Sequence, residues 1–347
     1  MTNAPGAAIL HAFYERMGLV AIVYVLVIFA VVVGVRRRRG EFFTGLAWPT
    51  TRYDAVRIGL GFLWIVDGLL QAQPDMSSQL LSNIVVPLFS TLPALLVRGF
   101  EPLVAQLSRH PLTFDLVIMW TQITLGLALC LAPPGRLRRL TLQATIVWGL
   151  GVWVIGEGMG GIFGGGATWL TGSPGSVLFY MAAAALLLQG EDRWRDQTVA
   201  REARWVFAGL WLFGAVIQAW PANGFWTASG LQAPVISMAQ MPQPHALSAL
   251  LYASAHLLAA HPVISNGAIV GVMLLLFLGY VFFADRPVVL YATLAWLLLT
   301  WVLGQDFGVM GGLGTDPNSS PAIALLMVAL WPDRPAKADA VSGGVRR

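Results

Sequence analysis

The sequence predicts an all-α membrane protein, a polytopic helical bundle of about nine transmembrane helices. Of its 347 residues, 57% are hydrophobic and only 11% are charged, and the mean hydropathy is +0.70. A soluble domain carries about 25% charged residues. The apolar residues also form runs close to the ~20 residues that a membrane-spanning helix needs. An internal repeat then predicts how the helices are grouped.

The first predicted span, 18–35, ends directly before four consecutive arginines. A secretory signal peptide has its positive charges before the apolar run, so we expect this segment to remain as an anchor. Because basic residues favour the cytoplasmic side, the order predicts an N-terminus outside a bacterial plasma membrane. Eight further spans are predicted, which place the C-terminus in the cytoplasm: 55–71, 112–131, 140–155, 177–188, 205–219, 263–283, 288–303 and 322–331.

An internal repeat relates two parts of the chain. Arg57, Trp64, Gln71 and Pro74 recur 147 positions later, at Arg204, Trp211, Gln218 and Pro221. The repeat predicts two four-helix units in the same orientation, a parallel arrangement about an axis along the membrane normal. The segments 75–109 and 222–260, rich in proline, are expected to be helices at the outer interface. The predicted division is an anchor and basic loop (1–54), repeat one (55–190), a charged cytoplasmic linker (191–204), repeat two (205–333) and a cytoplasmic tail (334–347).

Each unit carries a glycine-rich loop after its third helix. The first loop, 156–166, is GEGMGGIFGGG, and the second, 304–314, is GQDFGVMGGLG. Glycine permits positive φ and close backbone approach, so successive N–H groups can form an anion-binding nest. Tight turns in which small residues let helices pack closely are the alternative interpretation. The candidate ligand-binding glycines are Gly156, Gly158, Gly160, Gly161, Gly164, Gly308, Gly312 and Gly314.

Several acidic and amide side chains lie at a similar depth, near the predicted outer ends of the helices. An ionisable group within a predicted span is costly, which makes Asp67 a functional candidate. Glu157 and Asp306 lie in the two glycine loops, and with Asp67 they form a candidate proton relay. Gln71 and Gln218 are candidate ligand-binding amides in the same layer. A polar lock between helices is the alternative function of these groups.

Two tryptophans and two arginines complete the candidate site. Trp153 and Trp301 precede the glycine loops and are expected either to wall a pocket for a flat ligand or to anchor the helices in an aromatic belt. Arg98 and Arg109 fall in a predicted outer segment, where they would attract anions.

Other classes of site find little support in the residues. The single cysteine, Cys130, excludes an internal disulfide or a CxxC redox pair. His110 and His261 each precede a proline without a second short-range ligand, so helix starts are predicted rather than a metal site. A nucleic-acid partner would require a basic face on a soluble domain, and none is predicted.

The opening and closing motifs of the first unit resemble those of the DoxX/DoxD-like membrane families. The opening pattern R-x-x-x-G-x-x-W-x-x-x-G is carried by Arg57, Gly61, Trp64 and Gly68, and the closing pattern W-x-x-G-E-G-x-G-G-I-F by residues 153–163. The second loop ends in GTDPN at 314–318, as in those families. The resemblance implies a membrane subunit of a thiosulfate:quinone oxidoreductase. It also implies a quinone as electron carrier, no covalently bound cofactor, and a membrane or periplasmic redox partner.

Three functions stay open on the sequence. The first is a redox-associated membrane protein, a quinone-reactive subunit that handles sulfur oxyanions at the outer face. The second is a non-catalytic scaffold or accessory subunit of a larger complex. The third is a small-solute transporter, because parallel repeats around a polar centre are also a transporter design.

Overall fold

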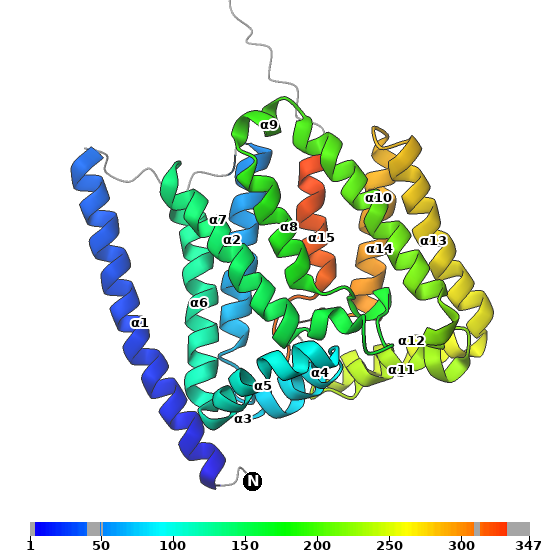
Figure 1. Cartoon of the computed structure of the whole chain (residues 1–347), viewed down its shortest axis with the longest axis horizontal. Coiled ribbons are helices and arrows are strands. Elements are labelled where there is room, and N and C mark those ends of the chain that lie inside the picture. Colours follow the sequence, from blue (N-terminus) through cyan, green and yellow to red (C-terminus); the bar gives the residue numbers. More distant parts are fainter. Residues whose placement is uncertain (1–3, 40–48, 50, 309–312, 332–347) are drawn as a thin grey trace, which may run out of the picture.

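The computed structural model describes residues 4–39, 49, 51–308 and 313–331, and within them every regular element is a helix (Figure 1). The predicted all-α class is therefore confirmed. Four helices of this described part are long and apolar enough to cross a membrane. They are α1 (Ala4–Arg39), α6 (Pro111–Leu131), α7 (Arg136–Gly151) with its π-helical continuation η2 (Val152–Gly156), and α13 (Pro262–Phe282).

The outer faces of these helices carry large apolar side chains that contact nothing else in the chain's core. A water-soluble protein rarely exposes an apolar surface of this extent, whereas a lipid bilayer covers it favourably. The surface is consistent with contact with a lipid bilayer. Strongly exposed examples are Val117 of α6, Val147 of α7, and Ile264, Leu275 and Phe282 of α13.

The bundle consists of two sets of helices that lie side by side (Figure 1). The first set is α2 (Arg52–Leu70), α6, α7 and α8 (Ser176–Leu188). The second set is α10 (Thr198–Ala219), α13, α14 (Pro287–Leu303) and α15 (Ser319–Met327), which continues as η6 (Val328–Leu330). Helix α2 packs chiefly on α6, α10 packs chiefly on α13, and α15 packs on α8 to join the sets. Helix α1 stands at the edge, beside α6.

Short helices cover one end of the bundle, which we call the α11 end (Figure 1). The segment between α2 and α6 forms α3 (Met76–Gln79), η1 (Leu80–Val85), α4 (Val86–Ser90) and α5 (Ala94–Arg109). The segment between α10 and α13 forms η5 (Pro221–Asn223), α11 (Ala228–Ala239) and α12 (His245–Ala260). Both segments are helical, as the sequence predicts. His110 and His261 directly precede α6 and α13, each of which has proline in its first turn.

The helix bounds differ from several of the predicted spans, for example at α10, which begins at Thr198 rather than 205, and two further differences have a local cause. Helix α1 begins at Ala4, its apolar window is Leu10–Val27 rather than 18–35, and the helix continues through the arginines because arginine is a good helix former. Helix α15 begins at Ser319 rather than 322. The side chain of Asn318 accepts a hydrogen bond from the Ser319 N–H, which fixes that earlier start.

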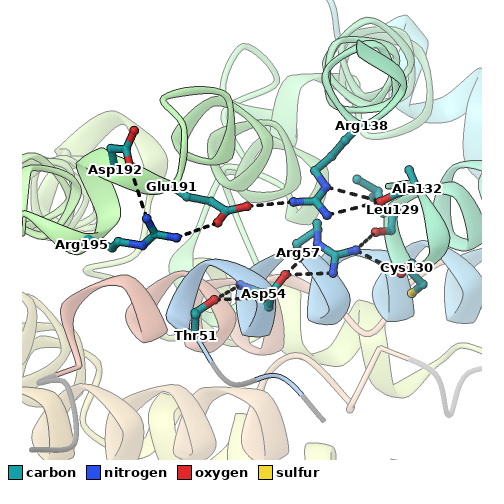
Figure 2. A network of polar contacts seen from close by, with 10 residues as sticks. All are labelled: Thr51, Asp54, Arg57, Leu129, Cys130, Ala132, Arg138, Glu191, Asp192 and Arg195. Atoms are coloured by element: carbon teal, nitrogen blue, oxygen red, sulfur yellow. Dashed lines mark hydrogen bonds and ion pairs between the residues drawn. The ribbon is translucent and has the colours of Figure 1, made fainter. Parts of the chain in front are cut away.

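Arginines tie the helices together at the opposite end, the α9 end, named for α9 (Glu191–Arg195) (Figure 2). Arg57 of α2 donates to the carbonyls of Leu129 and Cys130 at the end of α6, and it pairs with Asp54 at 2.9 Å. These carbonyls have no partner within their own helix, so the guanidinium supplies the missing donors. Arg138 of α7 joins the carbonyl of Ala132 to the carboxylate of Glu191, 3.1 Å away.

The second set of helices has a matching contact at this end. Arg204 of α10 donates to the carbonyls of Tyr280, at 2.7 Å, and Val281 at the end of α13. Each set thus fixes its first helix to its second by one arginine and two terminal carbonyls.

Candidate functional site

A cavity of about 340 Å³ lies between α2, α6 and α7, beneath η1 and α5. Val117 and Leu103 line it and are 52% and 45% exposed, so the cavity reaches the apolar outer surface of the bundle. An apolar molecule dissolved in a bilayer can therefore approach it. Its apolar lining consists of Leu80, Ile84, Val85, Leu103, Leu107, Phe114, Val117, Ile118, Trp148, Val152, Ile155 and Val177.

The inner end of this cavity is polar. Asp67 and Gln71 come from α2 and its C-terminus, and Gln122 comes from α6. They are only 1%, 2% and 3% exposed, and each has one oxygen without a hydrogen-bond partner. A buried polar atom without a partner costs roughly 1–3 kcal/mol. Such a cost is typical of a site that a ligand or a proton completes.

Tyr180 holds Asp67 in place. Its hydroxyl donates to Asp67 Oδ1 at 3.2 Å, and its ring packs edge-on against Trp64, with the ring centroids 5.0 Å apart. Tyr180 lies on α8, so this contact joins α8, the last helix of the first set, to α2, the first helix of that set. The second carboxylate oxygen of Asp67 stays free.

Two further carboxyl groups arrive from the glycine-rich connections. The first connection (157–175) runs from η2 to α8 and contains η3 (Gly158–Gly161) and η4 (Trp169–Thr171); the second (304–318) runs from α14 to α15. Glu157 Oε1 accepts from Ser176 Oγ at 2.6 Å and from the Val177 N–H at 3.2 Å. Asp316 Oδ1 accepts from the Asn318 N–H at 2.6 Å and Oδ2 from Thr315 Oγ1 at 3.1 Å. Carboxyl groups of the two connections therefore lie close together, in electrostatic contact with each other.

The surroundings of these two acids favour their neutral forms. Burial, followed by the nearby charge of Asp316, raises the pKa of Glu157 to about 8. Burial likewise raises the pKa of Asp316, although the Asn318 N–H, 2.6 Å from Asp316 Oδ1, opposes the rise. Both groups lie outside the membrane-spanning segments and within electrostatic reach of Asp67.

A second cavity, of about 390 Å³, lies at the α11 end between the two connections. Pro234, Ser237 and Met238 of α11 line one side, and the glycine loops line the other. We call it the outer cavity and the first one the lipid-side cavity. The two share a wall formed by Ile84, Gly156, Glu157, Thr315 and Asp316.

The glycines of both loops shape tight turns. Gly160 and Gly308 have φ of +66° and +68°, and a side chain at either would overlap the backbone of Pro174 or Asp316. This contact supports the packing interpretation at these two positions. Gly158, Gly161 and Gly164 belong to the same turns, Gly156 and Gly314 line the outer cavity, and Gly312 lies outside the described residues.

The other sequence candidates lie apart from the acid cluster. Asp306 has φ +53° and, unlike Glu157, lines neither cavity. Gln218 accepts from Thr168 at 2.7 Å and donates to Asn266 at 2.8 Å, a closed polar lock. Arg98 and Arg109 are exposed on α5 and line neither cavity. Trp153 and Trp301 donate to the carbonyls of Pro174 and Pro317, both at 2.8 Å, and the tryptophan that lines the lipid-side cavity is Trp148.

Sequence reasoning missed four groups of the site: Asp316, Ser176, Tyr180 and Gln122. Gln122 lies within a predicted span, so the rule that selected Asp67 also applied to it. Asp316 lies in the quoted loop ending GTDPN but was not considered as an acid. Nothing in the sequence pattern indicates Tyr180, because its role depends on which helix faces Asp67.

Comparison of the chain with protein-family models, with curated proteins and with solved structures finds no match. Among the described residues, no group of three or more His, Cys, Asp or Glu side chains is placed to hold a metal ion. The chemistry of the site is therefore argued from its own residues.

Proposed function

We propose that this chain is a quinone-reactive membrane subunit that binds a membrane-soluble quinone in the lipid-side cavity. The main support is the composition of one cavity. Its wall is apolar and reaches the lipid-facing surface, and its inner end holds buried acids and amides that lack some hydrogen-bond partners. A quinone has the same two parts, a tail that prefers lipid and a ring with two oxygens. The aromatic ring of Trp148 and the apolar wall suit the ring and tail, and Gln71 and Gln122 suit the oxygens.

Quinone reduction consumes protons and quinol oxidation releases them, so a quinone site needs groups that exchange protons. Asp67, Glu157 and Asp316 stand at the polar end of the cavity. All charged residues in the described lining are acidic, which does not favour a sulfur oxyanion there. We therefore assign oxidation of any such anion to a membrane or periplasmic redox partner, with this chain as the quinone-reactive subunit. A pure scaffold would not need buried, unpaired acids beside a cavity.

We also propose the finer architecture: nine spans, two parallel four-helix repeats with an N-terminal anchor, and the α11 end outside a bacterial plasma membrane. Matched contacts support the repeats. Arg57 and Arg204 bind terminal carbonyls of the next spanning helix in their set, and Trp153 and Trp301 bind proline carbonyls. The arginine-rich α9 end is then cytoplasmic.

The test is direct binding of decyl-ubiquinone and of a short-chain menaquinone to the purified full-length protein in detergent, by calorimetry. Gly151 lies at the exposed rim of the lipid-side cavity with open space around it. Gly151→Leu should weaken binding about tenfold or more by obstructing the entrance. Gly209→Leu is the matched control, since Gly209 is an equally open helical glycine of α10 that lines no described cavity.

Gly209→Leu should bind like the wild type, which removes partition into detergent as an explanation. Asp67→Ala should also weaken binding, by about tenfold, because the carboxyl group that can donate a hydrogen bond to a quinone oxygen is lost. Absence of binding to the wild type, or equal binding by the two glycine variants, would contradict the proposal.

A further inference from the structure

A further cavity, of about 240 Å³, lies at the α9 end, between the start of α7 and the end of α8. Arg138 and Arg139 of α7 line one side of it, and Leu187 and Leu188 of α8 line another. The exposed Gly135 also lines it, so the cavity opens to the surface. We call it the α9-end cavity, and it joins basic groups to an apolar wall.

The arginines beside this cavity carry more charge than the nearby acid balances. Arg138 pairs with Glu191 at 3.1 Å, and Glu191 also pairs with Arg195 at 3.3 Å (Figure 2). Arg136 and Arg139 are exposed, and neither has an ion pair or hydrogen bond from its side chain among the described residues. Within that part of the chain, the start of α7 therefore presents two guanidinium groups without a counter-charge.

Apolar side chains adjoin these two arginines on the outer surface. Leu137 and Leu140 lie beside Arg136 and Arg139 in the first turns of α7 and are 56% and 50% exposed. Val147, two turns beyond Leu140, continues this face and is 73% exposed. The basic groups thus lie where the apolar, lipid-facing surface of α7 begins.

An anionic phospholipid has the same two parts as this surface. Its phosphate carries the negative charge that guanidinium groups bind through paired N–H donors. Its acyl chains are stabilised by an apolar surface, whereas a soluble phosphate ester would use the arginines alone. Basic pockets between helices at a membrane surface bind anionic lipid head groups in this way.

We propose that the α9-end cavity is a binding site for an anionic phospholipid. Its phosphate binds Arg136 and Arg139, its glycerol backbone lies against Leu187 and Leu188, and its acyl chains follow the exposed face of α7. The bound lipid holds the α9 end at the level of the phosphate groups of the bilayer. The site shares no lining residue with the lipid-side cavity, so it is independent of the proposed quinone binding.

The test is native mass spectrometry of the full-length protein in detergent with dioleoyl-phosphatidylglycerol and dioleoyl-phosphatidylcholine, which have the same chains. The wild type should bind the anionic lipid at least about fivefold more tightly. The double change Arg136→Gln, Arg139→Gln should weaken phosphatidylglycerol binding about tenfold or more and remove the preference, because both partners of the phosphate are lost. This variant should fold, since both side chains are exposed, and an unchanged melting temperature in lipid-free detergent checks it.

The matched control is Arg98→Gln, Arg109→Gln, which removes the same charge from exposed positions of α5. This variant should keep the preference for phosphatidylglycerol. Equal losses in the two double variants would show attraction by net charge alone and would overturn the site. A wild type that binds the two lipids equally would overturn it as well.

Glycerol 3-phosphate distinguishes a lipid from a soluble phosphate ester, because it has the phosphate without the chains. At about a hundredfold molar excess it should leave most of the phosphatidylglycerol bound, since it gains nothing from the apolar face of α7. Leu140→Asn, which keeps both arginines, should weaken phosphatidylglycerol binding about twofold to fivefold. Displacement of most of the lipid at that excess would assign the arginines to a soluble phosphate ester and overturn the lipid site.

Discussion

The two sets of helices match at the α9 end and differ at the α11 end. At the α9 end, Arg57 and Arg204 make equivalent contacts with helix-terminal carbonyls. At the α11 end, Asp67 has Gly214 as its counterpart 147 positions later, and Gln122 has Met273 151 positions later, the separation between His110 and His261. The structural contacts are kept in both sets, and the polar groups of the cavity occur in one.

The corresponding region of the second set is filled by side chains. A Cβ at Gly214 would lie 3.0 Å from the sulfur of Met273 and 3.3 Å from the ring of Trp169. The Trp169 ring packs on Trp211, with centroids 4.6 Å apart. Gln218 has both ends of its amide paired, whereas the oxygen of Gln71 has no partner. At these positions the second set has the packed arrangement that stability favours, whereas the first tolerates unpaired groups, as functional sites do.

The same comparison holds for the glycine-rich connections. Glu157 accepts from the Val177 N–H at 3.2 Å, and Gln305 accepts from the Ser320 N–H at 3.1 Å. Because a neutral amide caps the last helix as well as a carboxylate does, capping does not explain the acid at 157.

The largest loss of stability is expected when an acid equivalent to Asp67 of the first set is placed at Gly214, the matching position of the second set. Gly214→Asp puts a carboxylate against Met273 and Trp169 with no partner, which should lower the free energy of unfolding by about 3–5 kcal/mol. Thermal unfolding of the purified protein in detergent measures this. Gly214→Ala adds only the Cβ and should cost much less. If Gly214→Asp were as stable as the wild type, the second set would contain unrecognised polar space.

A smaller loss of stability, similar for the two sets of helices, is expected from changes at the α9 end. Arg57→Gln and Arg204→Gln each remove charged donors from two helix-terminal carbonyls, and each should cost about 2 kcal/mol in the same unfolding assay. Arg57→Gln should cost slightly more, because it also leaves Asp54 without its ion pair. A large loss in one variant and none in the other would show that this end is not equivalent in the two sets.

The fold was predictable in outline because apolar runs, glycine loops and tryptophans recur at fixed spacing. Asp67 was also predictable, since an acid within a span is costly wherever the helix packs. The proximity of Asp316 to Glu157 was not predictable, because it depends on the packing of α15 on α8. Asp306 lies next to the repeat position of Glu157 in the sequence, but its backbone has positive φ and its side chain lines neither cavity. Contacts between the two sets depend on tertiary packing, which local pattern does not encode.

The dependence of stability on pH should also distinguish the connections. The pKa of Glu157 is raised from 4.5 to about 8 in the folded protein, so the folded state binds more protons than the unfolded state between these values. Stability should therefore fall as the pH rises from about 4.5 to about 8 and level off above that. Glu157→Gln should flatten the profile of melting temperature against pH. Gln305→Glu should steepen it, because position 305 is fully buried. A wild-type profile without a decline would contradict the raised pKa.

The smallest effect is expected from the exposed arginines, and it bears on which ligand the site takes. Arg98 and Arg109 lie on α5, and neither lines a cavity of the first set, although the sequence places them where they would attract anions. The double change Arg98→Gln, Arg109→Gln should alter stability by less than about 0.5 kcal/mol. It should also leave decyl-ubiquinone affinity unchanged, since a neutral ligand gains nothing from surface charge. A marked loss of quinone binding would move the entrance of the site to the face of α5. Retained binding in this variant together with lost binding in Gly151→Leu would place the entrance between α6 and α7.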